Sequence, residues 1–194
     1  MIESLKEIDG FIVLFINDLW FSFFSEFMWA VSAKITWIPL YVFMLYTMAK
    51  NLNKKTLFLL IAAIIFCVAC ADLISVHLFK NIFMRYRPSH NLLLTDQLNF
   101  YEISPGNYYK GGEYGFVSSH AANVTALVTM FLLGFKDLSK YWYYLLIFVV
   151  LLICFSRIYL GVHYLSDVFC GSLLGALIAY LVYKLIFIPI QKKR

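Results

Sequence analysis

Charged residues are scarce in this chain of 194 residues: Asp, Glu, Lys and Arg make up 14% of it, against 62% hydrophobic residues. Soluble domains are typically about one quarter charged and about half apolar. The mean hydropathy is +0.79. This shortage of charge excludes an ordinary soluble domain and predicts an integral membrane protein, with residues 1–194 forming one domain.

Cysteine is also rare, and no cysteine lies in a polar stretch. Cys67 and Cys70 form a C-x-x-C pair inside one apolar run, and Cys154 and Cys170 lie in others. We interpret all four as small buried hydrophobic side chains; redox chemistry or metal binding by the C-x-x-C pair is the alternative. The N-terminus lacks the basic start of a cleavable signal peptide, and the chain has no basic stripe suited to nucleic acid.

Apolar runs separated by charged turns predict an all-α, polytopic membrane bundle of about five to six transmembrane helices. A span needs about 20 apolar residues. The first 34 residues are expected to be an N-terminal segment: 1–19 as an amphipathic helix in the membrane interface, and 20–33 as a second interfacial helix or part of a marginal span. The helical core is expected over 35–188, with spans at 36–49 (lengthened by the preceding stretch), 57–79, 121–135, 141–155 and 164–188.

Lysines at the ends of the apolar runs predict the orientation, because cytoplasmic loops carry an excess of Lys and Arg. The long polar loop 81–116 and the turn 157–163 then fall together on the outer face. The expected cytoplasmic cations are Lys50, Lys54, Lys55, Lys136, Lys140, Lys192, Lys193 and Arg194.

The first of three motifs on that outer face is Lys80–Pro88. Lys80 and Arg87 are seven residues apart, which predicts that both lie on one side of a helix that Pro88 ends. Two fixed cations suit an anion with several oxygens. Ordinary interfacial anchoring is the alternative.

The second motif, Gly115–His120, opens the apolar run that begins at Ala121. A helix N-terminus binds anions through its free N–H groups and its dipole. Ser118 and Ser119 are expected to cap the helix, to donate to phosphate, or to do both. His120 has a pKa near neutrality and suits proton transfer.

The third motif, Ser156–Asp167, places an Arg, a His and an Asp in an apolar run, where ionisable groups are costly and usually functional. His163 and Asp167 are four residues apart, which predicts one face of a helix and a carboxylate that orients the imidazole as a nucleophile. The alternative is a pair that seals the start of a helix.

These three motifs, in this order, resemble the signature of the type 2 phosphatidic acid phosphatase (PAP2) superfamily: K-x6-R-P, then P-S-G-H, then S-R-x5-H-x3-D. Residues 80–88 and 156–167 match the outer motifs at full spacing. In the middle motif Val117 replaces the proline and Ser119 the glycine, which normally lets the backbone approach the phosphate closely. A serine amide still offers this contact, and its hydroxyl adds a donor.

The resemblance implies hydrolysis of a phosphate ester through a phosphohistidine, with no metal and no other cofactor. The residues themselves suggest the same roles: His163 attacks phosphorus, Asp167 orients it, and His120 protonates the leaving oxygen and then activates water. The expected phosphate-binding residues are Lys80, Arg87, Ser118, Ser119 and Arg157.

The expected substrate is a lipid phosphate whose tail stays in the bilayer, and the expected location is the bacterial inner membrane with the site facing the periplasm. Bacterial proteins with a similar second motif look like undecaprenyl diphosphate or lipid A phosphatases. Alternatives are a phosphatidylglycerophosphate or phosphatidic acid phosphatase, a vanadium-dependent haloperoxidase, and a non-catalytic lipid-phosphate binder or transporter. The expected partners are membrane lipids and no nucleic acid; the sequence predicts no oligomeric state.

Overall fold

The computed structural model describes residues 2–136 and 138–192, and its regular structure is mostly helical. Short π-helical turns at Ser75–Lys80 and Tyr183–Phe187 join α4 to α5 and α8 to α9. The elements are α1 (Ile2–Asn17), α2 (Ser22–Ser32), α3 (Ile38–Asn51), α4 (Lys54–Ile74), α5 (Asn81–Phe83), β1 (Glu102–Ser104), β2 (Asn107–Tyr108), α6 (Ser119–Gly134), α7 (Lys140–Tyr159), α8 (Leu165–Val182) and α9 (Ile188–Lys192). The predicted helical class is confirmed, with one small antiparallel hairpin, β1–β2, in the long loop.

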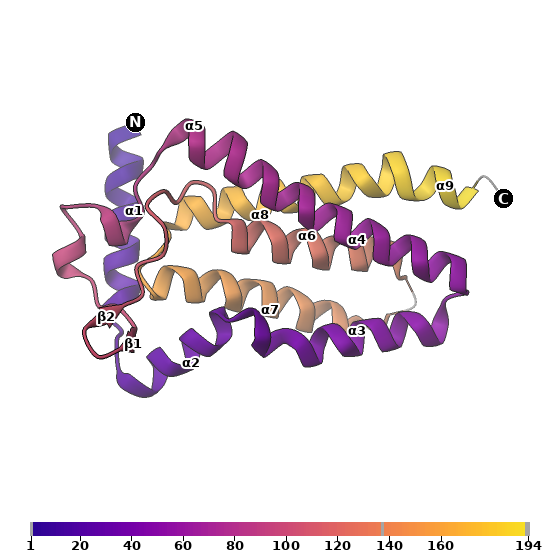
Figure 1. Cartoon of the computed structure of the whole chain (residues 1–194), viewed down its shortest axis with the longest axis horizontal. Coiled ribbons are helices and arrows are strands. Elements are labelled where there is room, and N and C mark those ends of the chain that lie inside the picture. The colour runs from indigo at the N-terminus through magenta and orange to yellow at the C-terminus, as the bar shows by residue number, and fades with distance from the viewer. Residues whose placement is uncertain (1, 137, 193–194) are drawn as a thin grey trace.

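The long helices run along one axis, and α1 lies across one end of them (Figure 1). Helices α4 and α7 run toward this end, whereas α6 and α8 run away from it, so four helix ends gather there. The loop between α5 and α6 covers the same end. This arrangement confirms that the topology brings the three motifs together.

The lysine-bearing turns α3–α4 and α6–α7 lie at the opposite end of the bundle. The predicted cations Lys193 and Arg194 lie outside the described residues. The side of the membrane that each end faces stays a prediction.

Helices α6 and α8 pack at close range because two glycines of α8 face the backbone of α6. A Cβ atom at Gly171 would lie 2.6 Å from the carbonyl oxygen of Ser118, and one at Gly175 would lie closer still to that of Ala122. Small residues at this four-residue spacing are typical of membrane helices that pack closely. The contact fixes the start of α8, and therefore the third motif, against the start of α6, which carries the second.

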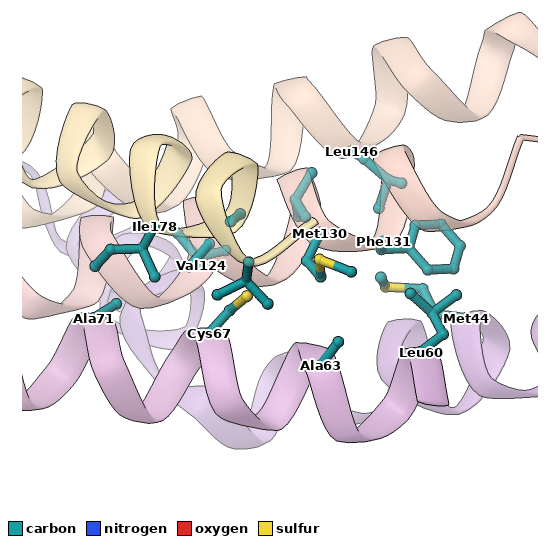
Figure 2. Close-up of a cluster of buried hydrophobic side chains, with 14 of the residues drawn as sticks. Met44, Leu60, Ala63, Cys67, Ala71, Val124, Met130, Phe131, Leu146 and Ile178 are labelled. Atoms are coloured by element: carbon teal, nitrogen blue, oxygen red, sulfur yellow. The ribbon is translucent and has the colours of Figure 1, made fainter. Parts of the chain in front are cut away.

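Apolar side chains from α3, α4, α6, α7 and α8 fill the space between the helices (Figure 2). Met44, Leu60, Val124, Met130 and Ile178 belong to this cluster.

Cys67 is fully buried in the same cluster, in accord with its interpretation as a small hydrophobic residue. Cys70 is partly buried, and the thiols of both residues are free.

The outward-facing side chains of the bundle are also apolar, including Phe58, Ile65, Phe148 and Phe169. Large exposed apolar surfaces are unusual on a soluble monomer and are expected where lipid is the solvent. Within the described residues, three helices are long and apolar enough to span a membrane, or four if α1 and α2, bent by 118°, form one broken span. The chain is therefore an integral membrane protein, and the count of five to six spans stays a prediction.

The N-terminal helix α1 carries two different faces. Leu5, Ile8 and Phe15 lie at the helical spacing from which the amphipathic helix is predicted, and they form an exposed apolar stripe that suits contact with lipid. Asp9, Val13 and Asn17, at four-residue spacing, are buried against the rest of the protein. The interfacial placement of α1 stays a prediction, but the helix is also packed onto the end of the bundle where the motifs meet.

The helix that carries Lys80 ends earlier than predicted. The prediction that it continues to Pro88 is wrong: it stops at Phe83, and Met84 takes a left-handed conformation with φ +42°. The next residues pair with a distant segment instead, since the amide of Arg87 donates to the carbonyl of Glu113 at 3.1 Å and that of Gly115 to the carbonyl of Arg85 at 2.9 Å. This strand-like pairing satisfies backbone groups that a helix would otherwise bond internally.

Candidate active site

The first pair of site residues joins the end of the α4–α5 helix to the start of α6. The ammonium of Lys80 donates to the hydroxyl of Ser119 at 2.7 Å, and the hydroxyls of Ser119 and Ser75 lie 2.7 Å apart. Ser119 therefore holds the Lys80 ammonium in one position. The departure from the family glycine at this position adds a hydroxyl that contacts a predicted phosphate-binding cation.

Arg87 reaches the site from the strand-like segment rather than from a helix face. Its Nε donates to the carbonyl of Tyr114 at 3.1 Å, and its Nη1 lies 3.1 Å from Nε2 of His163. The prediction that Lys80 and Arg87 share a helix face is therefore wrong, although both side chains reach the motif cluster. Pairing between the segments around Arg87 and Tyr114 replaces the helical geometry.

His163 and Asp167 are in contact, but a shared helix face does not explain it. The predicted helix through Val162–Asp167 is wrong, since α8 begins at Leu165 and His163 precedes it. The Asp167 carboxylate turns back toward the helix start: its Oδ2 accepts from the amide of Tyr164 at 3.1 Å and lies 3.3 Å from Nδ1 of His163. One carboxylate therefore both caps the helix and contacts the imidazole; the nucleophilic role of His163 stays a prediction.

The two neighbours of His163 determine which ring nitrogen carries the proton. Arginine has only donors, so Nε2 must accept from Arg87, and the proton must lie on Nδ1, which donates to Asp167. His163 is 1% exposed. This tautomer leaves a lone pair on Nε2, as a nucleophilic imidazole requires.

Electrostatics keep the His163 imidazole neutral. Burial lowers the pKa of His163 well below its ordinary value, and the nearby cations Arg87, Arg157 and Lys80 lower it further. Burial and the neighbouring Arg157 also lower the pKa of Arg87 to about 10. At neutral pH the site therefore combines a charged guanidinium with an uncharged imidazole. Burial and the nearby Arg157 also lower the pKa of His120 to about 3, so the predicted pKa near neutrality is wrong for His120 without a bound phosphate.

Arg157 and His120 lie on a cavity of about 190 Å³ between α2 and the ends of α6 and α7. At about 30 Å³ per water molecule this volume holds roughly six, which is room for a phosphoryl group. Arg157 is 2% exposed; it donates to the hydroxyls of Ser32 and, at 2.8 Å, Tyr109. Among the described residues its Nε has no hydrogen-bond partner.

Ser118 is fully buried at the start of α6. Its hydroxyl accepts weakly from the amide of Ala121 at 3.5 Å, and its amide donates to the carbonyl of Asp167 at 2.9 Å. The capping interpretation of Ser118 is therefore confirmed, and its contact with phosphate stays a prediction. Within residues 2–136 and 138–192, no three His, Cys, Asp or Glu side chains form a cluster that suits a metal ion.

The expected site residues did not include three that the structure places here: Asp9, Arg85 and Gly115. The sequence had only grouped Arg85 with the other outer-face cations as retained for chemistry. Arg85 donates to the Asp167 carboxylate at 2.9 Å and to that of Asp9 at 2.8 Å. A Cβ atom at Gly115 would lie 2.9 Å from Oδ2 of Asp167. The spacing of Asp9, Val13 and Asn17 was an available signal for the buried face of α1, but the stronger apolar stripe on its other face obscured it.

The sequence leaves two further questions open. Asp72 and His77 either support the site from below or pair with another helix, and four charged residues of the long loop either contact the headgroup or are simply solvated. Asn123 of α6 donates to the carboxylate of Asp72 at 2.9 Å, so Asp72 pairs with a neighbouring helix; the alternatives for His77 stay open. The loop residues proposed to contact a headgroup are all exposed, and two of them line a second cavity of about 420 Å³ beside Trp20 and Asn99. These loop residues are Asp96, Glu102, Lys110 and Glu113, with Asp96 and Lys110 at the cavity.

Comparison with known proteins places this geometry in context. A family model described as the PAP2 superfamily matches residues 55–190. The chain is 31% identical to the lipid A 4'-phosphatase of Porphyromonas gingivalis, over 94% of this chain and 74% of the relative. It is 33% identical to the lipid A 4'-phosphatase of Bacteroides thetaiotaomicron, over 94% of this chain and 79% of the relative.

A solved structure shares the fold. The PAP2-type phosphatidylglycerolphosphate phosphatase from Bacillus subtilis superposes with a TM-score of 0.69, covering 98% of this chain and 89% of the other, at 22% identity. The family match begins at residue 55, after α1, α2 and α3.

Proposed function

Because this chain belongs to the PAP2 superfamily and is a membrane lipid phosphatase, we propose that it removes the 4′-phosphate of lipid A through a phosphohistidine formed on His163. The names of the two relatives support this substrate over undecaprenyl diphosphate, which the sequence had left equally open. The contacts of His163 with Arg87 and Asp167, from which we infer its tautomer, are the observation that carries the mechanism.

The first step forms one bond and breaks one. Nε2 of His163 attacks phosphorus while the bond between phosphorus and the lipid oxygen breaks. Arg87 holds that lone pair at 3.1 Å, so its Nη1 must turn to a phosphoryl oxygen as the substrate enters. The guanidinium then neutralises negative charge on the phosphoryl oxygens, which reduces their repulsion of the attacking lone pair. The proton on Nδ1 stays in its hydrogen bond with Asp167.

The leaving lipid oxygen takes a proton from His120, which lies on the cavity wall beside Arg157. Burial and Arg157 lower the pKa of His120 to about 3, so His120 acts as this acid only after the negative charge of the bound phosphate raises that pKa. His120, now neutral, accepts a proton from water as that water attacks phosphorus. The bond between nitrogen and phosphorus breaks, inorganic phosphate leaves, and both histidines return to their starting states. No step in this scheme requires a metal ion.

The remaining donors hold the phosphoryl oxygens as charge moves between them. The Nε of Arg157, which has no partner in the part of the chain that the structure describes, supports a role on the cavity side. The Lys80–Ser119 pair supports a role at the start of α6. Ser118 belongs to the same helix start, where free amides and the helix dipole favour an anion. The lipid tails would stay in the bilayer, and the site would face the periplasm, opposite the lysine-bearing turns.

The direct test is phosphate release by the purified protein from a panel of lipids: lipid A, undecaprenyl diphosphate, phosphatidylglycerophosphate and phosphatidic acid. We expect lipid A to be hydrolysed fastest, with mass spectrometry locating the loss at the 4′ position. His163→Ala serves as the control for contaminating phosphatase. Faster hydrolysis of another lipid would reject the substrate but keep the reaction, whereas binding without phosphate release would favour a non-catalytic lipid binder.

A further inference from the structure

The two oxygens of the Asp167 carboxylate have separate partners. Oδ2 contacts His163 and the amide of Tyr164, whereas Oδ1 accepts from Nη1 of Arg85 at 2.9 Å. Asp167 is fully buried. Because both of its edges are engaged, the carboxylate cannot rotate about its own axis without losing an ion pair. Arg85 therefore determines which oxygen faces the imidazole.

Arg85 is itself held by a second carboxylate, from α1. Its Nη2 donates to Oδ2 of Asp9 at 2.8 Å, and its guanidinium lies 4.1 Å from the centre of the Tyr164 ring. Asp9 also accepts from the amide of Ser166 at 3.0 Å and from the Ser166 hydroxyl. Ser166 is the neighbour of Asp167, so Asp9 anchors both the guanidinium and the first turn of α8.

The charges in this chain of contacts depend on one another. Arg85 divides its attraction between two carboxylates, both largely buried, and buried charges need partners. If Asp9 loses its charge, Asp167 becomes the one charged carboxylate of this pair that attracts the Arg85 guanidinium. The carboxylate then moves toward Arg85 and becomes a weaker acceptor for Nδ1 of His163.

From these contacts we infer that Asp9 and Arg85 are positioning residues that hold the Asp167 carboxylate against His163, so that α1 is a working part of the site although it lies outside the family match. This inference rests on the proposed nucleophilic role of His163. Positive charge develops on the imidazole as Nε2 bonds to phosphorus, and the carboxylate stabilises that charge. The effect belongs to the chemical step, so it changes kcat rather than KM.

The test compares Asp9→Asn and Arg85→Lys with Glu7→Gln, a charge-neutralising control at an exposed position on the same helix. The Arg85→Lys substitution keeps the positive charge, but a single ammonium does not reproduce a fork that spans two carboxylates. We expect both variants to lower kcat by about 10- to 100-fold, the range typical when the carboxylate partner of a metal-bound histidine is lost, with KM within about twofold. We also expect slower formation of the phosphohistidine, partial recovery with Asp9→Glu, and no change with Glu7→Gln.

Each outcome is decisive when folding is checked by gel filtration and thermal unfolding. If Asp9→Asn does not fold, Arg85→Lys and the milder Ser166→Ala carry the test. Unchanged kcat per folded molecule would show that the contacts are merely structural and would overturn the inference while leaving the proposed function intact. An active His163→Ala, or a wild-type protein without phosphatase activity, would overturn both.

Discussion

Gly115 provides a steric test of the site, because its Cα faces the His163–Asp167 pair. A Cβ atom built there lies 2.9 Å from Oδ2 of Asp167, 3.0 Å from Cγ of Arg87 and 3.5 Å from Nδ1 of His163. Ordinary contacts begin near 3.4 Å. Gly115→Ala therefore forces Asp167 or the loop to move by about half an ångström, and Arg87 by nearly as much.

The expected cost is in turnover rather than in folding. A misplacement of about 1 Å at a reacting group costs roughly 100-fold, so we expect kcat to fall by about 10- to 100-fold. Overpacking of this kind also destabilises by about 1–3 kcal/mol. The backbone of Gly115 has no positive φ, so an alanine meets no additional conformational strain.

Gly112→Ala is the matched control, since a Cβ atom there has no neighbour within 4 Å and the residue is exposed. Phosphate release from lipid A in detergent micelles gives kcat and KM for both variants, with thermal unfolding measured on the same samples. A folded Gly115→Ala enzyme with kcat within twofold of wild type would refute the close packing of Gly115 against the pair. Equal losses in both variants would show that the loop, not the pair, is sensitive.

The His163–Asp167 pair, the absence of a metal requirement and the acid limb of the pH profile provide further tests. His163→Ala should lose turnover entirely, whereas Asp167→Asn should lower kcat by roughly two to four orders of magnitude and leave KM nearly unchanged in steady-state assays; normal turnover in His163→Ala would contradict the nucleophile. EDTA should leave activity intact, and complete loss reversed by a divalent ion would contradict a metal-independent reaction. A protonated imidazole cannot attack, and the pKa of His163 is lowered. After correction for titration of the substrate, the acid limb of the kcat/KM profile should therefore lie below about pH 6.5, the ordinary histidine pKa. An acid limb at or above that pH would contradict a neutral His163.

Ser119 bears on how far the middle motif departs from the family pattern. The Ser119 hydroxyl accepts from Lys80 at 2.7 Å and holds the ammonium that is proposed to bind phosphate. Ser119→Ala should therefore raise the KM for lipid A about fivefold, the equivalent of about 1 kcal/mol for one hydrogen bond. An unchanged KM in the same phosphate-release assay would contradict this role.

The sequence predicts which helix ends meet, because apolar runs and their order determine a topology with alternating directions. It does not predict local geometry equally well. The seven-residue spacing of Lys80 and Arg87 suggested two helical turns, but the helix ends at Phe83 because the segment of Arg87 pairs with residues near Glu113. Such pairing joins residues almost thirty positions apart, and no local pattern encodes it.

The interior of the site shows the same limit. His163 and Asp167 are in contact as predicted, but through a capping arrangement at the start of α8 rather than along a helix face. Asp9 reaches the site from an amphipathic helix whose apolar stripe faces outward. A single carboxylate on the other face of that helix carries little signal until the partner that neutralises it, Arg85, is known.

The most direct test of the central claim is to trap the enzyme during its first turnover by alkaline quench and to locate the bound phosphate by mass spectrometry. We predict a phosphate that is stable in base and labile in acid, attached to His163 and absent from His163→Ala. Phosphate on Ser118 or Ser119 instead, or a first turnover that releases phosphate without any phosphorylated enzyme, would contradict the mechanism.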